Sequence, residues 1–118
     1  MAIPSGSGSE VLKRSTFSNL ATGSSQADKT FIDGVANHIY TVISIIACSK
    51  QAGAANFGIE VWSAGSTECG IVTSYSLPGY ATYVWNDKFI ISGTDELRLA
   101  WAGSDLDVSV SYIDQDWT

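Results

Sequence analysis

The chain of 118 residues has the length of one domain, and with 45% hydrophobic and 15% charged residues it can form a packed core. Its formal net charge is -6 and it has only six lysines and arginines, without a cluster. This balance argues against nucleic acid or an anionic membrane as a partner, because both are bound through clustered cations.

The first nine residues are small and polar apart from Ile3 and Pro4. This composition predicts an N-terminal arm over residues 1–9, which either frays or orders against a neighbouring subunit, and a single domain over residues 10–118. The start lacks the basic region and the apolar core of a secretion signal, so we expect synthesis in a reducing cytosol. Cys48 and Cys69 are then expected to be free thiols, packed as small buried hydrophobes.

Strand and turn signals alternate along the rest of the chain. A first strand is expected over residues 10–17 and a weaker one over residues 28–35. The clearest long strand is 38–48, whose apolar residues lie on both faces, as is typical of a central strand covered on both sides. Further strands are expected over residues 56–63, 69–77, 80–85, 89–91, 97–101 and 106–112, with turn residues between them.

The last expected strand has the cleanest alternation, since its apolar residues 106, 108, 110 and 112 are separated by polar ones. One of its faces is therefore expected to be buried and the other wet. No stretch of a dozen residues has helical spacing, and strands without helical crossovers pair antiparallel. The sequence predicts an all-β fold, an antiparallel sandwich or barrel, and we favour a β-sandwich of jelly-roll type.

Groups suited to catalysis are few. His38 is the single histidine and opens a strand, where an ordinary surface or edge position is the simpler interpretation. Nothing in the sequence around Cys48 or Cys69 marks a reactive thiol, and one histidine with two distant cysteines does not have the spacing of a zinc site. We expect no enzymatic activity, no catalytic residues, no metal and no cofactor.

Aspartates form two i, i+2 pairs near the C-terminus, Asp105 with Asp107 and Asp114 with Asp116. Oxygen-rich loops bind calcium, and paired carboxylates can hydrolyse glycosides. The segment lacks the further ligands and the turn glycine of an EF-hand, and nothing selects two of the twelve acidic residues as a catalytic pair. A solvated outer face of the sheet is the favoured interpretation.

Tryptophans are the remaining functional hint. Trp62 lies on the polar face of its strand, and Trp117 follows the last strand among acidic residues. Exposed aromatic residues stack on sugars or anchor protein interfaces, so interface contact and simple burial both stay open for these two. Trp85 and Trp101 share faces with other large apolar residues and are expected in the core.

Three segments resemble small virion proteins of tailed phages: residues 1–14 (MAIPSGSGSEVLKR), 38–42 (HIYTV) and 107–118 (DVSVSYIDQDWT). The resemblance implies a structural protein of the phage particle, and in particular a head decoration (cement) protein that binds the capsid surface and stabilises it. It implies assembly in the host cytoplasm and a final location in the virion.

The partners implied by this resemblance are the major capsid protein and further copies of the chain, as a homotrimer or homodimer. The residues expected to contact a partner or a second subunit are Ile3, Pro4, Val11, Leu12, Trp62 and Trp117. A carbohydrate- or receptor-binding module of a phage tail or fibre is the alternative hypothesis, in which Trp62 or Trp117 would stack on a sugar.

Overall fold

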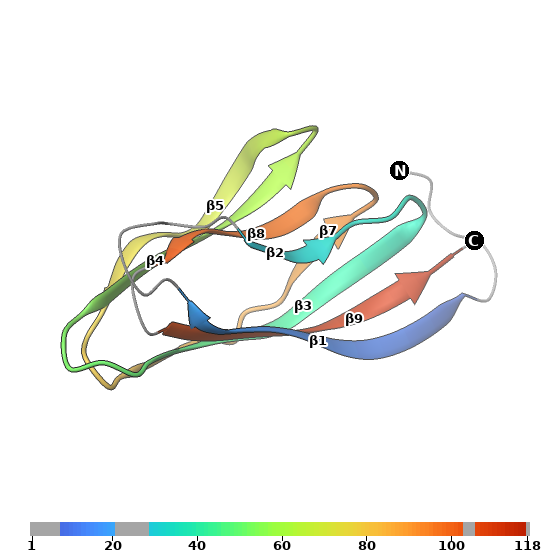
Figure 1. Cartoon of the computed structure of the whole chain (residues 1–118). Coiled ribbons are helices and arrows are strands. Elements are labelled where there is room, and N and C mark those ends of the chain that lie inside the picture. Colours follow the sequence, from blue (N-terminus) through green and yellow to red (C-terminus); the bar gives the residue numbers. More distant parts are fainter. Residues whose placement is uncertain (1–7, 21–28, 103–105, 118) are drawn as a thin grey trace.

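The computed structural model describes residues 8–20, 29–102 and 106–117, without the side chains of residues 18–20, 67, 68 and 100–102. Within these residues, nine strands form two antiparallel sheets that pack face to face (Figure 1). The strands are β1 (Ser9–Leu20), β2 (Lys29–Asp33), β3 (His38–Ser49), β4 (Ala55–Ser63), β5 (Ser66–Leu77), β6 (Thr82–Trp85), β7 (Phe89–Ser92), β8 (Glu96–Ala102) and β9 (Leu106–Asp116).

The first sheet, here called sheet A, has the order β1-β9-β3-β6, with β7 also paired to β3. Residues 45–48 of β3 pair with β6 and residues 39–42 pair with β7, so these two short strands share one edge of β3. The second sheet, sheet B, has the order β2-β8-β4-β5. The expected all-β fold, an antiparallel β-sandwich, is confirmed.

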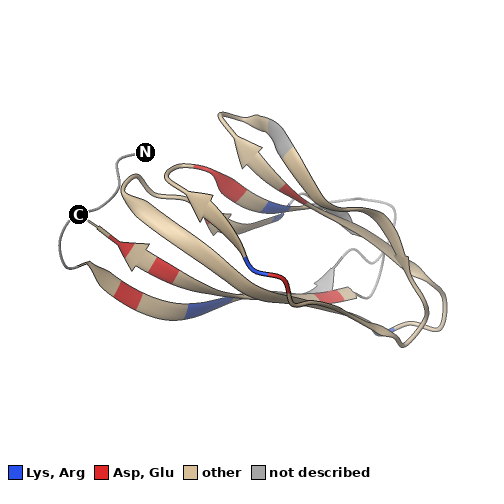
Figure 2. Cartoon of the chain, turned by 180° about the vertical axis from the view of Figure 1, so that it is seen from behind, with Lys and Arg blue, Asp and Glu red and all other residues tan. Residues whose placement is uncertain are grey.

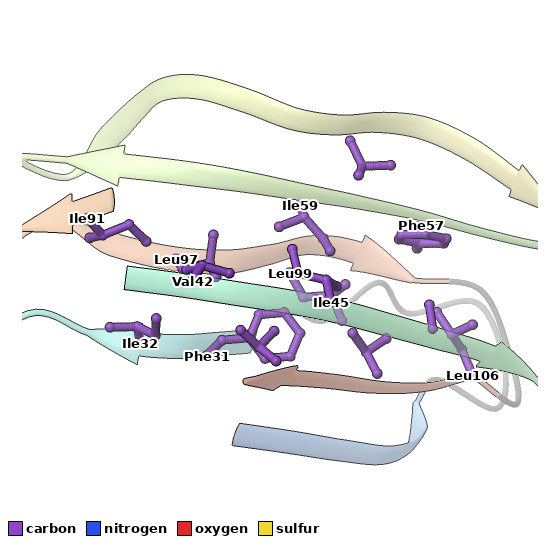
Figure 3. Packing of buried hydrophobic residues seen from close by; sticks show 14 of the residues in the cluster. Phe31, Ile32, Val42, Ile45, Phe57, Ile59, Ile91, Leu97, Leu99 and Leu106 are labelled. Atoms are coloured by element: carbon purple, nitrogen blue, oxygen red, sulfur yellow. The ribbon is translucent and has the colours of Figure 1, made fainter. Parts of the chain in front are cut away.

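The core lies between the sheets and is built from one face of each (Figure 3). From sheet A, β9 turns Leu106, Val108 and Val110 inward, and all three are fully buried, as the alternation predicted. From sheet B, β8 contributes Leu97 and Leu99, which are also fully buried. Burial of one such side chain stabilises the fold by roughly 2 kcal/mol, so this alternation holds the sheets together.

Aromatic pairs join the two sheets along both sides of the sandwich. Phe17 of β1 and Phe31 of β2 have ring centroids 5.1 Å apart. On the opposite side, Tyr83 of β6 lies 5.3 Å from Phe57 of β4 and 4.8 Å from Tyr75 of β5. Ring pairs at these separations stabilise the fold by more than the burial of their area alone. They therefore hold the edge strands of one sheet against those of the other.

β3 is the central strand that was expected, but the residues that the structure describes bury only one of its faces fully. Val42 and Ile45 are fully buried on the inner face. A bulge between Val42 and Ser44 in the pairing with β9 places Ile43 beside Ser44 in the lining of the outer face. Ile46, also on that face, is 43% exposed. Within the described residues, the expectation of a strand covered on both sides is therefore not met at Ile46.

Several smaller expectations are resolved by the fold. Cys48 in β3 and Cys69 in β5 are both free, as expected, but their expected burial is wrong, because Cys48 is half-buried and Cys69 is exposed. Cys48 faces outward beside Asp107, and Cys69 lies on the edge strand β5. Trp85 is half-buried and packs against the core. The side chain of Trp101 lies outside the described residues.

The arm expected over residues 1–9 also falls almost entirely outside the described residues, and β1 begins at Ser9. Along the chain that the structure describes, no helix has the length and apolar character needed to cross a membrane.

Candidate functional site

An apolar row crosses the outer face of sheet A in register. Leu12 pairs with Ile113, Ile113 with Thr41, and Thr41 with Ile90. Because directly opposed residues of antiparallel strands point to the same face, these four side chains are neighbours across the whole sheet. Leu12 is 72% exposed and Ile90 is 65% exposed, so both ends of the row face solvent.

A second apolar pair lies on the same face toward the other end of the sheet. Ile46 pairs with Val84, and they are 43% and 51% exposed. Near the first row, an open depression of about 530 Å³ is lined by Leu12, Lys13, Arg14, Ile43, Ser44 and Ser111. We call the apolar surface made by these rows the A-face; it consists of Leu12, Thr41, Ile43, Ile46, Val84, Ile90 and Ile113.

The A-face differs from the usual solvated face of an antiparallel sheet, on which polar residues alternate with the core residues. Acidic residues do occur on β1 and β9, near the end of sheet A where the described chain begins and ends (Figure 2). Along β3 and β7, the outward positions include isoleucines as well as small polar residues; the A-face isoleucines on these two strands are Ile43, Ile46 and Ile90. Four large apolar residues of the A-face are exposed, Leu12, Ile46, Val84 and Ile90, and exposed apolar residues gathered on one face can mark a site of interaction with another molecule.

β1 forms one edge of sheet A, with β9 on its inner side. No other strand among the described residues pairs with its outer side. Six consecutive residues of this strand, 9–14, are exposed. An edge strand of this kind presents a row of backbone N–H and C=O groups that another strand can bind.

A polar cluster surrounds Asp114 on the inner face of the same end of sheet A. Lys13 Nζ donates to Asp114 Oδ2 over 2.7 Å, and His38 Nδ1 lies 2.7 Å from Asp114 Oδ1. His38 Nε2 lies 3.5 Å from Asp116 Oδ1, and its ring stacks on that of Tyr40 with centroids 5.8 Å apart. The carboxylate thus connects β1, β9 and β3.

The electrostatics of this cluster favour the ion pair. Burial, which leaves Asp114 only 7% exposed, acts to raise the pKa of its carboxyl group. The hydrogen bonds from Lys13 and His38 outweigh that effect, and the pKa of Asp114 is lowered from its ordinary value. The hydrogen bond to Asp114 also raises the pKa of Lys13.

Two expectations are corrected by this cluster. Asp114 was assigned to a solvated outer face, but it is buried; His38 was assigned to a surface or edge position, but it begins the central strand with its side chain 17% exposed. The alternation of β9 continues past Tyr112 to Asp114 and predicts the inward position. Among the described residues, no group of three or more histidine, cysteine or acidic side chains is arranged to hold a metal ion.

Trp62 lies on the outer face of sheet B, on the polar side of its strand as expected. The guanidinium carbon of Arg98 lies 4.3 Å from the centroid of its ring, in a cation–π arrangement. Trp62 Nε1 donates to Glu60 Oε2 over 3.0 Å, and Arg98 Nη2 donates to Glu96 Oε1 over 3.1 Å. One face of the indole ring and its N–H group are therefore already occupied within the chain.

Trp117 is half-buried at the end of β9. Its backbone N–H donates to the carbonyl of Asn37 over 3.0 Å. Its ring lies against Gly8, where an added Cβ would come 2.9 Å from Cε3 of the indole. The buried Nε1 of Trp117 has no hydrogen-bond partner among the described residues.

The six expected contact residues do not form one surface. Val11 and Leu12 are exposed neighbours on β1, whereas Trp62 lies on the other sheet, and Ile3 and Pro4 are outside the described residues. Sequence reasoning missed the A-face residues of β3, β6, β7 and β9. The signal that could have found them is the pattern of β3, with apolar residues on both faces. No protein-family model matches the chain, and no curated protein matches it either.

Proposed function

We propose that the chain is a structural protein of a tailed-phage particle, a head decoration (cement) protein that binds the capsid through its A-face. The observation that carries the proposal is the difference between the two faces of β3. Its apolar residues are typical of a strand covered on both sides, yet Ile46 is 43% exposed on the outer side. A protein partner that covers the A-face accounts for this pattern.

The strand order supports the jelly-roll form of the sandwich. If β6 and β7 are taken as one interrupted strand, each sheet contains four strands, and the first and last strands of the chain lie side by side. Jelly rolls recur in viral capsid proteins and in lectins. This order, together with the resemblance of both chain ends to virion proteins, supports a role in the particle.

The chemistry of the A-face supports a protein as the partner. All of its residues except Thr41 are aliphatic, and an aliphatic surface is stabilised by contact with another aliphatic surface. A formal charge of -6 disfavours binding to the enclosed genome. On a capsid, many copies of one modest contact around the shell give strong attachment without a single tight site. The proposal assigns no catalytic role to the chain.

An attachment assay tests the A-face. Ile90→Asp places a charge at the exposed end of the apolar row of the A-face, and Val35→Asp places one at a comparably exposed residue in the connection between β2 and β3. Undecorated heads of the parent phage are mixed with each purified variant and sedimented. We expect Ile90→Asp to lose attachment and Val35→Asp to keep it, with both variants folded by circular dichroism. Equal occupancy of the heads by both variants would contradict the assignment of the A-face.

A second experiment tests the N-terminal arm separately. Deletion of residues 2–9 is expected to weaken attachment to heads and to leave the domain folded. Unchanged occupancy after this deletion would remove the arm from the proposal but leave the A-face in place. A cryo-electron microscopy reconstruction of the parent particle would then locate the domain on the shell.

The contacts of Trp62 make sugar binding the weaker hypothesis. Stacking on a sugar needs a free aromatic face, and Arg98 lies over one face of Trp62 at 4.3 Å. The hypothesis is tested on a glycan array with the native chain, Trp62→Ala and Trp117→Ala. Binding that either substitution abolishes would favour the carbohydrate-binding alternative over the capsid protein.

A further inference from the structure

We propose that two copies of the chain pair through β1, antiparallel about a two-fold axis at Leu12, so that their two A sheets become one continuous sheet. The occupant of the open edge is thus a second copy of the chain. This inference goes beyond the proposed function, because it concerns the isolated protein in solution and stands on the edge of β1 alone.

Charged residues usually protect an edge strand from pairing, and β1 carries Glu10, Lys13 and Arg14. Lysine on an edge strand normally prevents pairing, because its charge would have to be desolvated. Here the ammonium group of Lys13 is bound to Asp114 at 2.7 Å on the inner face, so its charge is compensated within the chain. The pairing of β1 with β9 runs without interruption from Ser9 to Phe17, and the irregularity begins only after Phe17. A straight segment is therefore available to a second strand.

Symmetry restricts the possible registers. A two-fold axis perpendicular to the sheet keeps the outward residues of both copies on the same face, so even-numbered residues meet even-numbered ones. Glu10, Leu12 and Arg14 all point to the outer face, because their partners on β9 are the outward residues Gln115, Ile113 and Ser111. These three residues therefore decide the register.

One register makes the charges complementary. With the axis at Leu12, Glu10 lies opposite the partner's Arg14, and Arg14 lies opposite the partner's Glu10. Axes at Glu10, Lys13 or Arg14 would instead oppose like charges. Arg14 has no ion pair or hydrogen bond with the rest of the described chain. Glu10 Oε1 accepts a hydrogen bond from the uncharged side chain of Gln115, whose Nε2 lies 2.7 Å away, and the described residues place no cation beside it.

The same register joins the apolar surfaces. Leu12, which is 72% exposed, meets the partner's Leu12 at the axis. Each Leu12 is the first residue of the apolar row that continues through Ile113 and Thr41 to Ile90. The paired sheets therefore carry one A-face twice as wide as that of a single copy.

A charge-exchange experiment tests the register. Arg14→Glu opposes two glutamates at each end of the paired segment, and Glu10→Arg opposes two arginines. Each single variant is expected to raise the dimer dissociation constant roughly tenfold or more, because two pairs change from attraction to repulsion. The double variant Glu10→Arg/Arg14→Glu restores the complementary pairs and is expected to recover the native value. Lys88→Glu, at an exposed residue between β6 and β7, is the matched control and is expected to leave the constant unchanged. Sedimentation equilibrium measures all five proteins.

Cross-linking tests the position of the axis directly. In a Cys48→Ser/Cys69→Ser background, Leu12→Cys places two thiols opposite each other across the axis, close enough for a disulfide. Thr16→Cys places the two thiols roughly 26 Å apart, at about 3.3 Å a residue, and is the matched control. Mild oxidation is expected to cross-link the Leu12→Cys protein and not the Thr16→Cys protein.

A native chain that is monomeric up to its solubility limit, or trimeric, would overturn the proposal. A dimer that neither weakens in the single charge variants nor cross-links at Leu12→Cys would also overturn it. These outcomes are distinct from the failure of the proposed function, which is measured as attachment to heads. A β1 dimer that does not bind heads would leave this inference intact.

Discussion

Lys13 Nζ and Asp114 Oδ2 lie 2.7 Å apart although 101 residues separate them in the chain. Through this contact the first strand is fastened to the last one. Because His38 Nδ1 lies 2.7 Å from the other oxygen of Asp114, one carboxylate cross-links three adjacent strands of sheet A. A buried carboxylate requires such partners, and their loss leaves it unsatisfied.

Asp114→Asn is expected to lower the free energy of unfolding by about 2 kcal/mol, because hydrogen bonds between charged groups are lost at a buried position. The measurement is urea denaturation followed by tryptophan fluorescence. Asp107→Asn is the matched control on the same strand: Asp107 is 36% exposed and lies 3.3 Å from Lys50 Nζ. This control substitution is expected to lower the free energy of unfolding by less than about 1 kcal/mol. Equal losses in the two variants would contradict the special role of Asp114.

Acid is expected to destabilise the fold through the same group. Burial acts to raise the pKa of Asp114, but the bonds from Lys13 and His38 lower it below its ordinary value of 3.8. The folded state therefore binds this proton less readily than the unfolded state. The stabilisation is complete above pH 3.8 and is lost as the pH falls from there through the folded pKa. Urea denaturation across this range should show a steeper loss for the native chain than for Asp114→Asn. Parallel curves would exclude Asp114 as the cause.

Neighbouring isoleucines on β7 test the assignment of inner and outer faces. Ile91 is 1% exposed and Ile90 is 65% exposed. Ile91→Ala leaves a cavity in the core and should lower the free energy of unfolding by about 3 kcal/mol. Ile90→Ala shortens a side chain that is mostly exposed to solvent and should change the free energy of unfolding by less than about 0.5 kcal/mol. The opposite ranking in thermal or urea denaturation would mean that the faces of β7 are reversed.

The two thiols are expected to react at different rates. Cys69 is exposed and Cys48 is half-buried, so a thiol reagent such as Ellman's should modify Cys69 first in the folded protein. Cys69→Ser is expected to remove the fast phase, and Cys48→Ser is expected to retain it. A single rate for both thiols would show that the exposures differ less than the structure indicates.

Local patterns were enough to predict the strands and most of their inward residues. The alternation of residues 106–112 placed Leu106, Val108 and Val110 correctly in the core, and the polar side of β4 correctly carried Trp62. Extending that alternation by two residues would have placed Asp114 inside as well. The residue type argued against an inward position for Asp114, because a carboxylate is seldom buried. Its partners, Lys13 and His38, lie far away in the sequence and could not be identified from it.

The A-face was harder to predict, for two physical reasons. The bulge at Ile43 interrupts the period of two along β3, so its outward and inward residues cannot be separated by counting. The row from Leu12 to Ile90 is assembled from four strands, and their order depends on pairings that no local pattern encodes. Apolar residues on both faces of a strand predict that both faces are buried. They do not show whether the residues that bury the outer face belong to the same chain or to a partner.

The place of β9 between β1 and β3 has a consequence for how the protein is made. During synthesis β1 emerges from the ribosome well before β9, so β1 cannot pair with β9 until the intervening strands have been made. Until then, β3 also lacks its neighbour on that side. Sheet A can therefore be completed only after β9 has been synthesised, so its formation depends on pairing between strands that lie far apart in the sequence.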